Sequence, residues 1–349
     1  MIRLFSIILI LLGTLTTFSQ EDSGFSYSRM QVSLKAKKND ASFKLINGVH
    51  NNVARAKIAP AIQGTWKQTE NQSIFTPLVP LQWNTSYTLL HNNNLHTFTI
   101  PIPEDYKPLQ VTAIHPNTTT LPANFLKWYI QFSKPINPSR IYDHITITDG
   151  DGNPIDRALL PLLNPLLSKD RTLLTLWIEP GRQKRDLGPN ARLGSVFKTG
   201  ERYALSISGL KDHNGISMPS HFTQQFTIAT ADRKKPAIET WMIKTPTPGT
   251  IEPLRIICNE TLDYGSIQDA LHITTKTGIE IAGKTQWNPK KKTIYFIPIS
   301  NWNNDYYTIL FDKTLEDLAG NNIVRLFDAD VRDSSKELYT QKTRSFQIN

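Results

Sequence analysis

Apolar and polar residues alternate over short stretches along most of the chain, and a helical period of 3.6 residues is nearly absent. Residues 128–132 (WYIQF), 173–178 (LLTLWI) and 293–297 (TIYFI) are rich in aromatic and β-branched side chains. Pro, Gly, Asn and Asp flank these stretches, which is typical of strands separated by tight turns. The helix-like stretches 154–167 and 266–271 are short or interrupted by proline. The pattern therefore predicts an all-β protein.

One succession of strands occurs three times along the chain. A strand that ends in proline is followed by a strand that begins with tyrosine, and a closing strand completes the copy. The copies lie at 74–77, 87–90 and 96–100, at 176–180, 203–207 and 225–228, and at 295–298, 307–310 and 345–348. The second and third copies also share opening strands at 128–136 and 254–262 and, after them, strands at 144–148 and 271–275. A single sheet cannot bury its apolar face, so each copy predicts a sandwich of two sheets with about seven strands.

The repeats divide the chain into three units. We place them at 25–101, 108–230 and 236–349, joined by short proline-containing links at 101–108 and 229–236. Links of this composition predict a semi-rigid rod of modules. The first unit matches the others only in its second half, so we expect it to be a divergent or incomplete sandwich.

Two motifs resemble a known family. Residues 315–321 (LEDLAGN) follow a tyrosine-led strand and resemble the Asp-x-x-Gly-Asn turn of bacterial Ig-like domains of the S-layer type. Residues 210–215 (LKDHNG) hold the corresponding place in the second unit, and 132–136 (FSKPI) resemble the exit of the family's opening strand. The resemblance covers about 230 residues and is poor in the first unit. It implies tandem Ig-like β-sandwiches in an extracellular setting, and it implies no catalytic role.

The N-terminus resembles a secretory signal peptide. Arg3 precedes the apolar run 4–12, and small or hydroxyl residues follow, with Thr17 and Ser19 at the −3 and −1 positions of a cleavage site. The run is shorter than the roughly 20 residues that span a bilayer. We therefore predict a signal peptide at 1–19 and a secreted, periplasmic or cell-surface protein without a transmembrane helix in its mature chain. An uncleaved N-terminal anchor is the alternative.

Charge and cysteine content narrow the possible partners. The 349 residues include 39 Lys and Arg against 30 Asp and Glu, a net charge of +9. In an exported protein this surplus favours envelope polysaccharide or another surface protein and not nucleic acid. The single cysteine, Cys258, excludes an intrachain disulfide and any multi-cysteine metal site. Its place within a strand indicates a buried, unreactive thiol. We expect no cofactor.

One inserted loop is the strongest candidate for ligand binding. The interval between the proline and the strand-leading tyrosine is much longer in the second unit than in the other two, because residues 181–194 are inserted there. Loops on a rigid scaffold often carry function. The insertion has four basic side chains that could bind a carboxylate, sulfate or phosphate: Arg182, Lys184, Arg185 and Arg192. A solvated loop, or an arginine that braces a neighbouring module, is the alternative.

Two further features have a structural and a functional interpretation. Asp149, Asp151 and Asn153 resemble the first half of a calcium loop, but Pro154 stands where that loop needs glycine, which favours a hairpin turn. Trp83 and Trp302 begin near-identical stretches in front of tyrosine-led strands. An exposed pair could stack on sugar rings, whereas equivalent positions favour a structural plug at the end of each sandwich.

The sequence contains no catalytic signature of a serine hydrolase, zinc protease or P-loop enzyme. We therefore predict a non-catalytic, exported protein of tandem Ig-like modules that acts as a spacer, adhesin-like module or scaffold. The alternative is a glycan- or protein-binding module that uses the 181–194 loop. A secreted hydrolase or an accessory to one is the third hypothesis.

Overall fold

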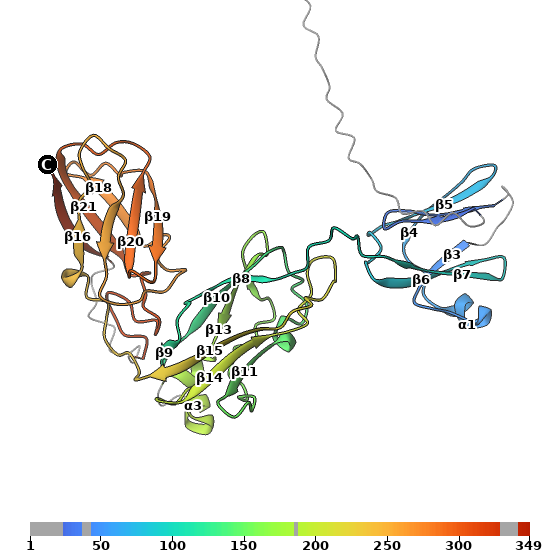
Figure 1. The fold of residues 1–349 in the computed structure, drawn as a ribbon, viewed down its shortest axis with the longest axis horizontal. Coiled ribbons are helices and arrows are strands. Elements are labelled where there is room, and N and C mark those ends of the chain that lie inside the picture. Colours follow the sequence, from blue (N-terminus) through green and yellow to red (C-terminus); the bar gives the residue numbers. More distant parts are fainter. Residues whose placement is uncertain (1–23, 37–42, 185–187, 329–340) are drawn as a thin grey trace, which may run out of the picture. The chain divides into compact units, whose positions relative to one another are not determined.

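The computed structural model describes residues 24–36, 43–184, 188–328 and 341–349 (Figure 1). The predicted signal peptide lies outside these residues. The chain divides into two compact units, one comprising residues up to Lys107 with Asn214–Ile216, the other comprising Pro108–His213 and Ser217–Asn349. Among the described residues, the buried apolar side chains form three large clusters, which lie within 32–100, 109–228 and 238–348. We call the segments around them the first (25–100), second (108–230) and third (236–349) module.

The first module contains two antiparallel sheets, with strand orders β1-β2-β5-β4 and β3-β6-β7. Its elements are β1 (Phe25–Tyr27), β2 (Val32–Lys35), β3 (Phe43–Asn47), α1 (Val53–Ile58), β4 (Gly64–Gln68), β5 (Gln72–Pro77), β6 (Thr85–His91) and β7 (Asn94–Ile100). Both sheets contribute buried side chains, such as Phe75 and Leu89, to one cluster. The module therefore has both sheets of a sandwich, even though its opening half does not match the repeat in sequence.

The second module has sheets of order β12-β13-β10-β8 and β11-β14-β15-β9. Its elements are β8 (Val111–His115), β9 (Thr120–Pro122), β10 (Lys127–Phe132), a 3₁₀ helix (Ile141–His144), β11 (Ile145–Asp149), β12 (Leu166–Leu167), β13 (Leu173–Trp177), α2 (Pro180–Gln183), α3 (Gly188–Leu193), β14 (Arg202–Ile207) and β15 (Phe222–Ala229). The short strand β9 pairs in parallel with β15, and the described residues of the other modules form no counterpart to it.

The third module has sheets of order β16-β17-β20-β19 and β18-β21-β22. Its elements are a 3₁₀ helix (Ile238–Thr240), β16 (Met242–Lys244), β17 (Leu254–Ile257), β18 (Leu271–Thr275), β19 (Gly283–Asn288), β20 (Thr293–Pro298), β21 (Asp305–Asp312) and β22 (Gln341–Ile348). Its core lies between the sheets and includes Trp302 and Phe311.

All three modules share one topology once β9 is set aside. Numbered within each module, strands 1, 2, 5 and 4 form one sheet and strands 3, 6 and 7 form the other. This is the order of the seven-stranded constant-type immunoglobulin sandwich, in which strands A, B, E and D face strands C, F and G. The structure therefore confirms the predicted all-β fold of tandem Ig-like sandwiches.

The tyrosine that leads the sixth strand of each module has the same structural role in all three. The hydroxyls of Tyr87, Tyr203 and Tyr307 each accept a hydrogen bond from a backbone N–H four or five residues upstream, at 2.8, 3.1 and 3.0 Å. The rings are buried in the core. This bond fixes the crossing from one sheet to the other, which is the tyrosine corner of Ig sandwiches.

We expect Tyr307→Phe to lower the free energy of unfolding of the third module by about 1–2 kcal/mol, because the backbone N–H of Asn303 then loses its acceptor. Urea denaturation followed by tryptophan fluorescence measures this. The neighbouring Tyr306 is 51% exposed, so Tyr306→Phe is a matched control and should change stability by less than about 0.5 kcal/mol. Equal effects of the two variants would contradict the assignment of the corner.

Candidate functional site

The inserted loop of the second module folds around Arg182. The loop contains most of α2 and all of α3, and Arg182 is 6% exposed. Its guanidinium donates to the backbone carbonyls of Asp156 (2.6 Å), Leu193 (3.2 Å), Gly194 (3.0 Å) and Ser195 (3.1 Å). Every nitrogen of the guanidinium therefore has a partner within the module, and Arg182 is not available to a ligand. The sequence gives no signal for this role, because the acceptors of the Arg182 guanidinium are backbone carbonyls and not particular side chains.

The other basic residues of the loop differ in their surroundings. The ammonium of Lys184 lies 4.6 Å from the ring centre of Phe327, which belongs to the third module. Arg192 lies on the exposed α3 and donates to the carbonyl of Gly188 at 3.2 Å. Arg185 lies outside the described residues. Among its described basic residues, the loop thus has one buried arginine, one lysine in contact with the neighbouring module and one exposed arginine.

The 149–153 segment forms a tight turn that closes on its own carboxylate. Oδ1 of Asp149 accepts from the backbone N–H groups of Asp151 (3.0 Å) and Asn153 (2.8 Å), and the Asn153 amide donates to Oδ2 at 3.2 Å. These bonds lower the pKa of Asp149, the one from the backbone of Asn153 most. Gly152, with a φ of +88°, supplies the left-handed residue that the turn requires.

The same turn occurs at 317–321, in the motif that carries the family resemblance. Asp317 accepts from the backbone of Ala319 and Asn321 at 2.8 and 3.0 Å and from the Asn321 amide at 2.8 Å. Residues 149–153 therefore form a second Asp-x-x-Gly-Asn turn. Its sequence signal is the spacing of Asp149, Gly152 and Asn153, which also resembles the start of a calcium loop. No group of three or more His, Cys, Asp or Glu side chains suited to a metal ion occurs among the described residues.

The tryptophans and the cysteine lie mainly inside the modules. Trp302 is 1% exposed, and its indole N–H donates to the carbonyl of Glu252 at 2.8 Å. Trp83 is half-buried, with the Arg29 guanidinium 4.5 Å from the centre of its ring. Cys258 is buried, and burial raises the pKa of its thiol. Trp302 is thus a plug in the core, and the thiol is unreactive.

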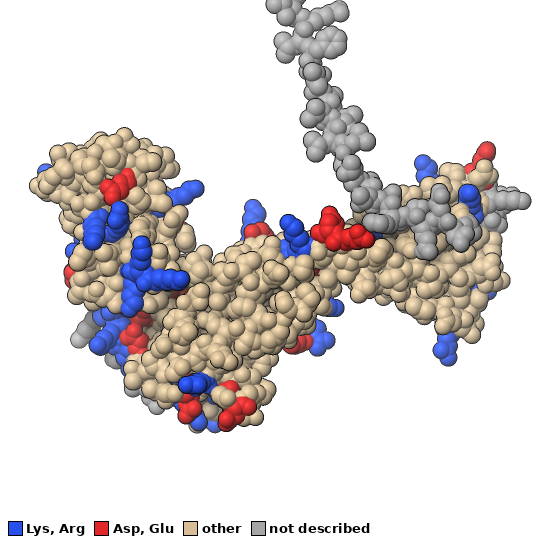
Figure 2. All heavy atoms as spheres, in the orientation of Figure 1, with Lys and Arg blue, Asp and Glu red and all other residues tan. Residues whose placement is uncertain are grey.

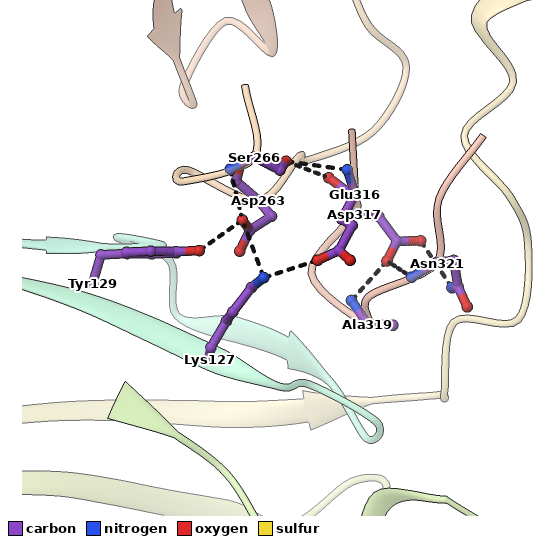
Figure 3. Close-up of polar contacts among 8 residues, drawn as sticks. All are labelled: Lys127, Tyr129, Asp263, Ser266, Glu316, Asp317, Ala319 and Asn321. Atoms are coloured by element: carbon purple, nitrogen blue, oxygen red, sulfur yellow. Dashed lines mark hydrogen bonds and ion pairs between the residues drawn. The ribbon is translucent and has the colours of Figure 1, made fainter. Parts of the chain in front are cut away.

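The most developed polar cluster lies where the second and third modules meet (Figure 3). The Lys127 ammonium, which β10 carries, lies 2.8 Å from Oε2 of Glu316 and 3.5 Å from Oδ1 of Asp263. Both carboxylates belong to loops of the third module. Lys127 is nearly buried and Asp263 fully so, whereas Glu316 is partly exposed. We call this arrangement the joint cluster.

Tyr129 extends the joint cluster along β10. Its hydroxyl donates to Oδ1 of Asp263 at 2.8 Å, and the backbone N–H of Ser266 donates to the same oxygen at 2.9 Å. A Cβ on Gly265 would lie 2.5 Å from the Tyr129 hydroxyl, so only glycine permits this approach. Beside it, the rings of His115 and Tyr264 stack with their centroids 4.0 Å apart.

Burial controls the protonation of the joint cluster. Burial raises the pKa of Asp263, and Lys127 offsets only part of that effect. Burial alone would lower the pKa of Lys127, but Asp263 and Glu316 together raise it above its ordinary value, so the amine stays charged. Burial also raises the pKa of Tyr129, whose hydroxyl therefore remains a donor. The ionised form of Asp263 thus depends on contacts supplied by the second module.

The Asp-x-x-Gly-Asn turn of the third module joins the same interface. The Asn321 amide donates to the backbone carbonyl of Asp232 in the linker at 3.1 Å, and the Asn124 amide donates to that carbonyl at 2.6 Å. The backbone N–H of Leu126 donates to the carbonyl of Leu318 at 3.2 Å. Burial raises the pKa of Asp317 to about 7. The family motif therefore organises a turn and also docks it on the second module.

A groove of about 660 Å³ lies elsewhere, beside the edge strands β18 and β19 of the third module. His272 lies in it with Nδ1 2.8 Å from Oε1 of Glu280, and both side chains are exposed. The pair could orient an imidazole, and Asp269, Lys284 and Thr285 also line the groove.

Comparisons with known proteins found one family model and several solved structures. Residues 233–332 match the family model described as bacterial Ig-like domain. No curated protein matches the chain. Among solved structures, the N-terminal part of the bacterial S-layer protein SbsC is 14% identical over 58% of this chain and 40% of that chain, with a TM-score of 0.26. A tandem from titin is 11% identical over 81% and 89%, with a TM-score of 0.21. Alpha-2-macroglobulin from Escherichia coli is 11% identical over 69% and 72%, with a TM-score of 0.23.

Within the described part of the chain, no helix combines the length and the apolar character needed to cross a membrane.

Proposed function

We propose that this chain, which carries a bacterial Ig-like domain at 233–332, is a non-catalytic, exported structural protein whose second and third modules form one rigid segment. It acts as a spacer or scaffold in the cell envelope or outside the cell. Export is inferred from the signal peptide expected at 1–19, and the non-catalytic role from the Ig-like modules and from a sequence without catalytic signatures.

The joint cluster is the observation that carries the proposal. A protein that only tethered independent modules would need no contacts between them beyond a linker, because linkers leave neighbouring modules free to rotate. Here Lys127 and Tyr129 both bond Asp263 across the interface, and β10 holds the two side chains on one face. Burying charges costs free energy unless they are paired and hydrogen-bonded. Such an interface supports a function that depends on a fixed angle between the modules.

Distances between spin labels on the two modules test the proposal. Cys258 is buried, so labels attach selectively to cysteines introduced at Lys198 in the second module and Thr277 in the third, both exposed. We expect double electron–electron resonance on the full chain to give a narrow distance distribution. Lys127→Met should broaden it, because the third module loses its main charged contact.

Two comparisons make this experiment decisive. Labels at Thr277 and Lys290, both in the third module, give the width that the labels themselves contribute. Arg192→Met removes an exposed charge from the second module and should leave the distribution between the modules unchanged. A broad distribution in the unmodified protein would overturn the rigid segment.

The binding alternative is less well supported at the loop where the sequence placed it. Arg182 and Lys184 already have partners within the chain, and of the described basic residues of the loop only Arg192 is exposed to a ligand. The loop therefore offers an anionic partner little contact surface through its described basic residues.

A further inference from the structure

The outer face of the four-stranded sheet of the third module is unusually basic. In this sheet, of order β16-β17-β20-β19, Leu254 and Ile256 point into the core, while the alternate residue Arg255 points outward. The strand register aligns the outward residues in one row across the sheet: Lys244, Arg255, Tyr295 and Gln286. Adjacent strands lie about 4.8 Å apart, so the row presents groups at regular intervals on a rigid support.

Most of the cations on this face have no ion pair or side-chain hydrogen bond within the described part of the chain. Lys284 lies on β19, and the β19–β20 hairpin carries three consecutive lysines, Lys290 to Lys292. No ion pair or side-chain hydrogen bond to the described residues is formed by Lys244, Lys284, Lys290 or Lys291, and all four are exposed. In Figure 2 the third module carries several Lys and Arg side chains, with Asp and Glu side chains beside some of them.

The same module uses its other cations differently. On the opposite sheet, the Lys342 ammonium pairs with Glu239 at 2.8 Å, and the Arg344 guanidinium donates to the carbonyls of Ile238 and Trp241. Among the described residues of the basic face, Arg255 pairs with Glu252 at 2.9 Å and the Lys292 ammonium donates to the carbonyl of Asn259 at 3.4 Å. Exposed lysines without a described ion pair also occur elsewhere on the module, at Lys276 and Lys313, but those of the basic face lie together on one sheet and its hairpin.

Apolar groups lie among these cations. Ile257, Tyr295 and Ile297 are half-buried on the outer face, and Met242 is 58% exposed. Carbohydrates pack the apolar faces of their rings on aromatic and aliphatic side chains of this kind, while cations contact their acidic groups. A phosphate-rich duplex could meet the hairpin lysines but would leave the apolar side chains of the sheet uncovered, so the test includes duplex DNA.

We propose that this face, defined by Lys244, Arg255, Lys284, Tyr295 and the hairpin lysines, binds an anionic polysaccharide. Acidic groups of the polymer pair with the unpartnered lysines, and its sugar rings lie over Tyr295 and the neighbouring aliphatic side chains. The inference rests on the extracellular setting in the proposed function but not on the rigid joint. It gives the spacer an attachment surface on its third module.

The test compares two full-length variants that lose the same charge. One replaces Lys284, Lys290 and Lys291 by Gln, and the control replaces Lys169, Lys198 and Arg202, exposed cations of the second module, by Gln. Binding to immobilised polygalacturonate and heparin is measured by interferometry at two salt concentrations, with neutral dextran as a blank. We expect the first variant to bind at least about tenfold more weakly and the control to change less than about twofold, because only cations near the polymer contribute.

Each possible outcome decides the proposal. Equal weakening in both variants would show attraction to net charge alone and would overturn the site, as would unchanged binding in the first variant. Duplex DNA and phosphatidylserine vesicles are tested in the same way. If the unmodified protein bound one of them, lost that binding in the first variant, and bound neither polysaccharide, the face would be reassigned to another partner and the proposal would also be overturned. Circular dichroism confirms that each variant is folded, and label distances across the joint test the spacer function separately.

Discussion

Replacing Lys127 by Met is expected to lower the free energy of unfolding of the second and third modules by about 3 kcal/mol. Met keeps most of the aliphatic stem but removes the ammonium, so Asp263 is left as a buried carboxylate whose remaining donors are Tyr129 and the Ser266 backbone. Removing one partner of a buried ion pair costs about 3–5 kcal/mol. The lower end applies because Glu316, the other partner, is 29% exposed and can turn to water.

Urea denaturation of the full chain measures this effect, with one variant as a control and one as a rescue. Lys198→Met removes an exposed ammonium from the same module and should shift stability by less than about 0.5 kcal/mol. Adding Asp263→Asn to Lys127→Met should restore part of the loss, because no uncompensated charge then remains buried. An unaltered unfolding transition for Lys127→Met would show that the joint cluster contributes nothing to stability.

Replacing Arg182 by Met is expected to destabilise the second module by about 3 kcal/mol. The four carbonyls that its guanidinium bonds lie on two segments, Asp156 and residues 193–195. Each loses a charge-assisted hydrogen bond to a guanidinium that is itself buried. Arg182→Lys should rescue little, because a single ammonium cannot reach four acceptors in a fork.

The same variant separates the structural role of Arg182 from a role in ligand binding. Arg192→Met, on the exposed surface of α3, should leave stability within about 0.5 kcal/mol of the unmodified protein. If Arg182→Met kept full stability and lost affinity for an anionic polymer, the structural role would be excluded. Thermal unfolding and interferometry on the same samples provide both measurements.

Strand positions were predictable because their signal is local. The predicted stretches 128–132 and 293–297 fall within β10 and β20, and 173–178 ends one residue beyond β13. Inward and outward residues alternate along these strands, and the alternation is visible in the sequence because each sheet has a core face and a solvent face. The first module was harder, because its opening strands β1 and β2 span only three and four residues.

The candidate site was much less predictable. Tyr129 and Asp263 lie 134 positions apart, and nothing in either local sequence indicates that they meet. Arg182 was one of four basic side chains expected to be able to bind an anion, and its four acceptors are backbone carbonyls, which leave no signature in the side-chain pattern. The turn at 149–153 could have been recognised, because its Asp, Gly and Asn have the same spacing as those at 317–321.

The sequence by itself determined the three-fold repeat, the all-β fold and the tyrosine that leads each sixth strand, because these depend on alternation and turn chemistry within a few residues. Only the tertiary structure decided which charges are paired. The cost of burying a charge depends on the groups that surround it, and chain segments far apart in sequence supply those groups. Folding therefore places Lys127 in a joint and Arg182 in a loop core, and it leaves the lysines of one sheet face exposed to solvent.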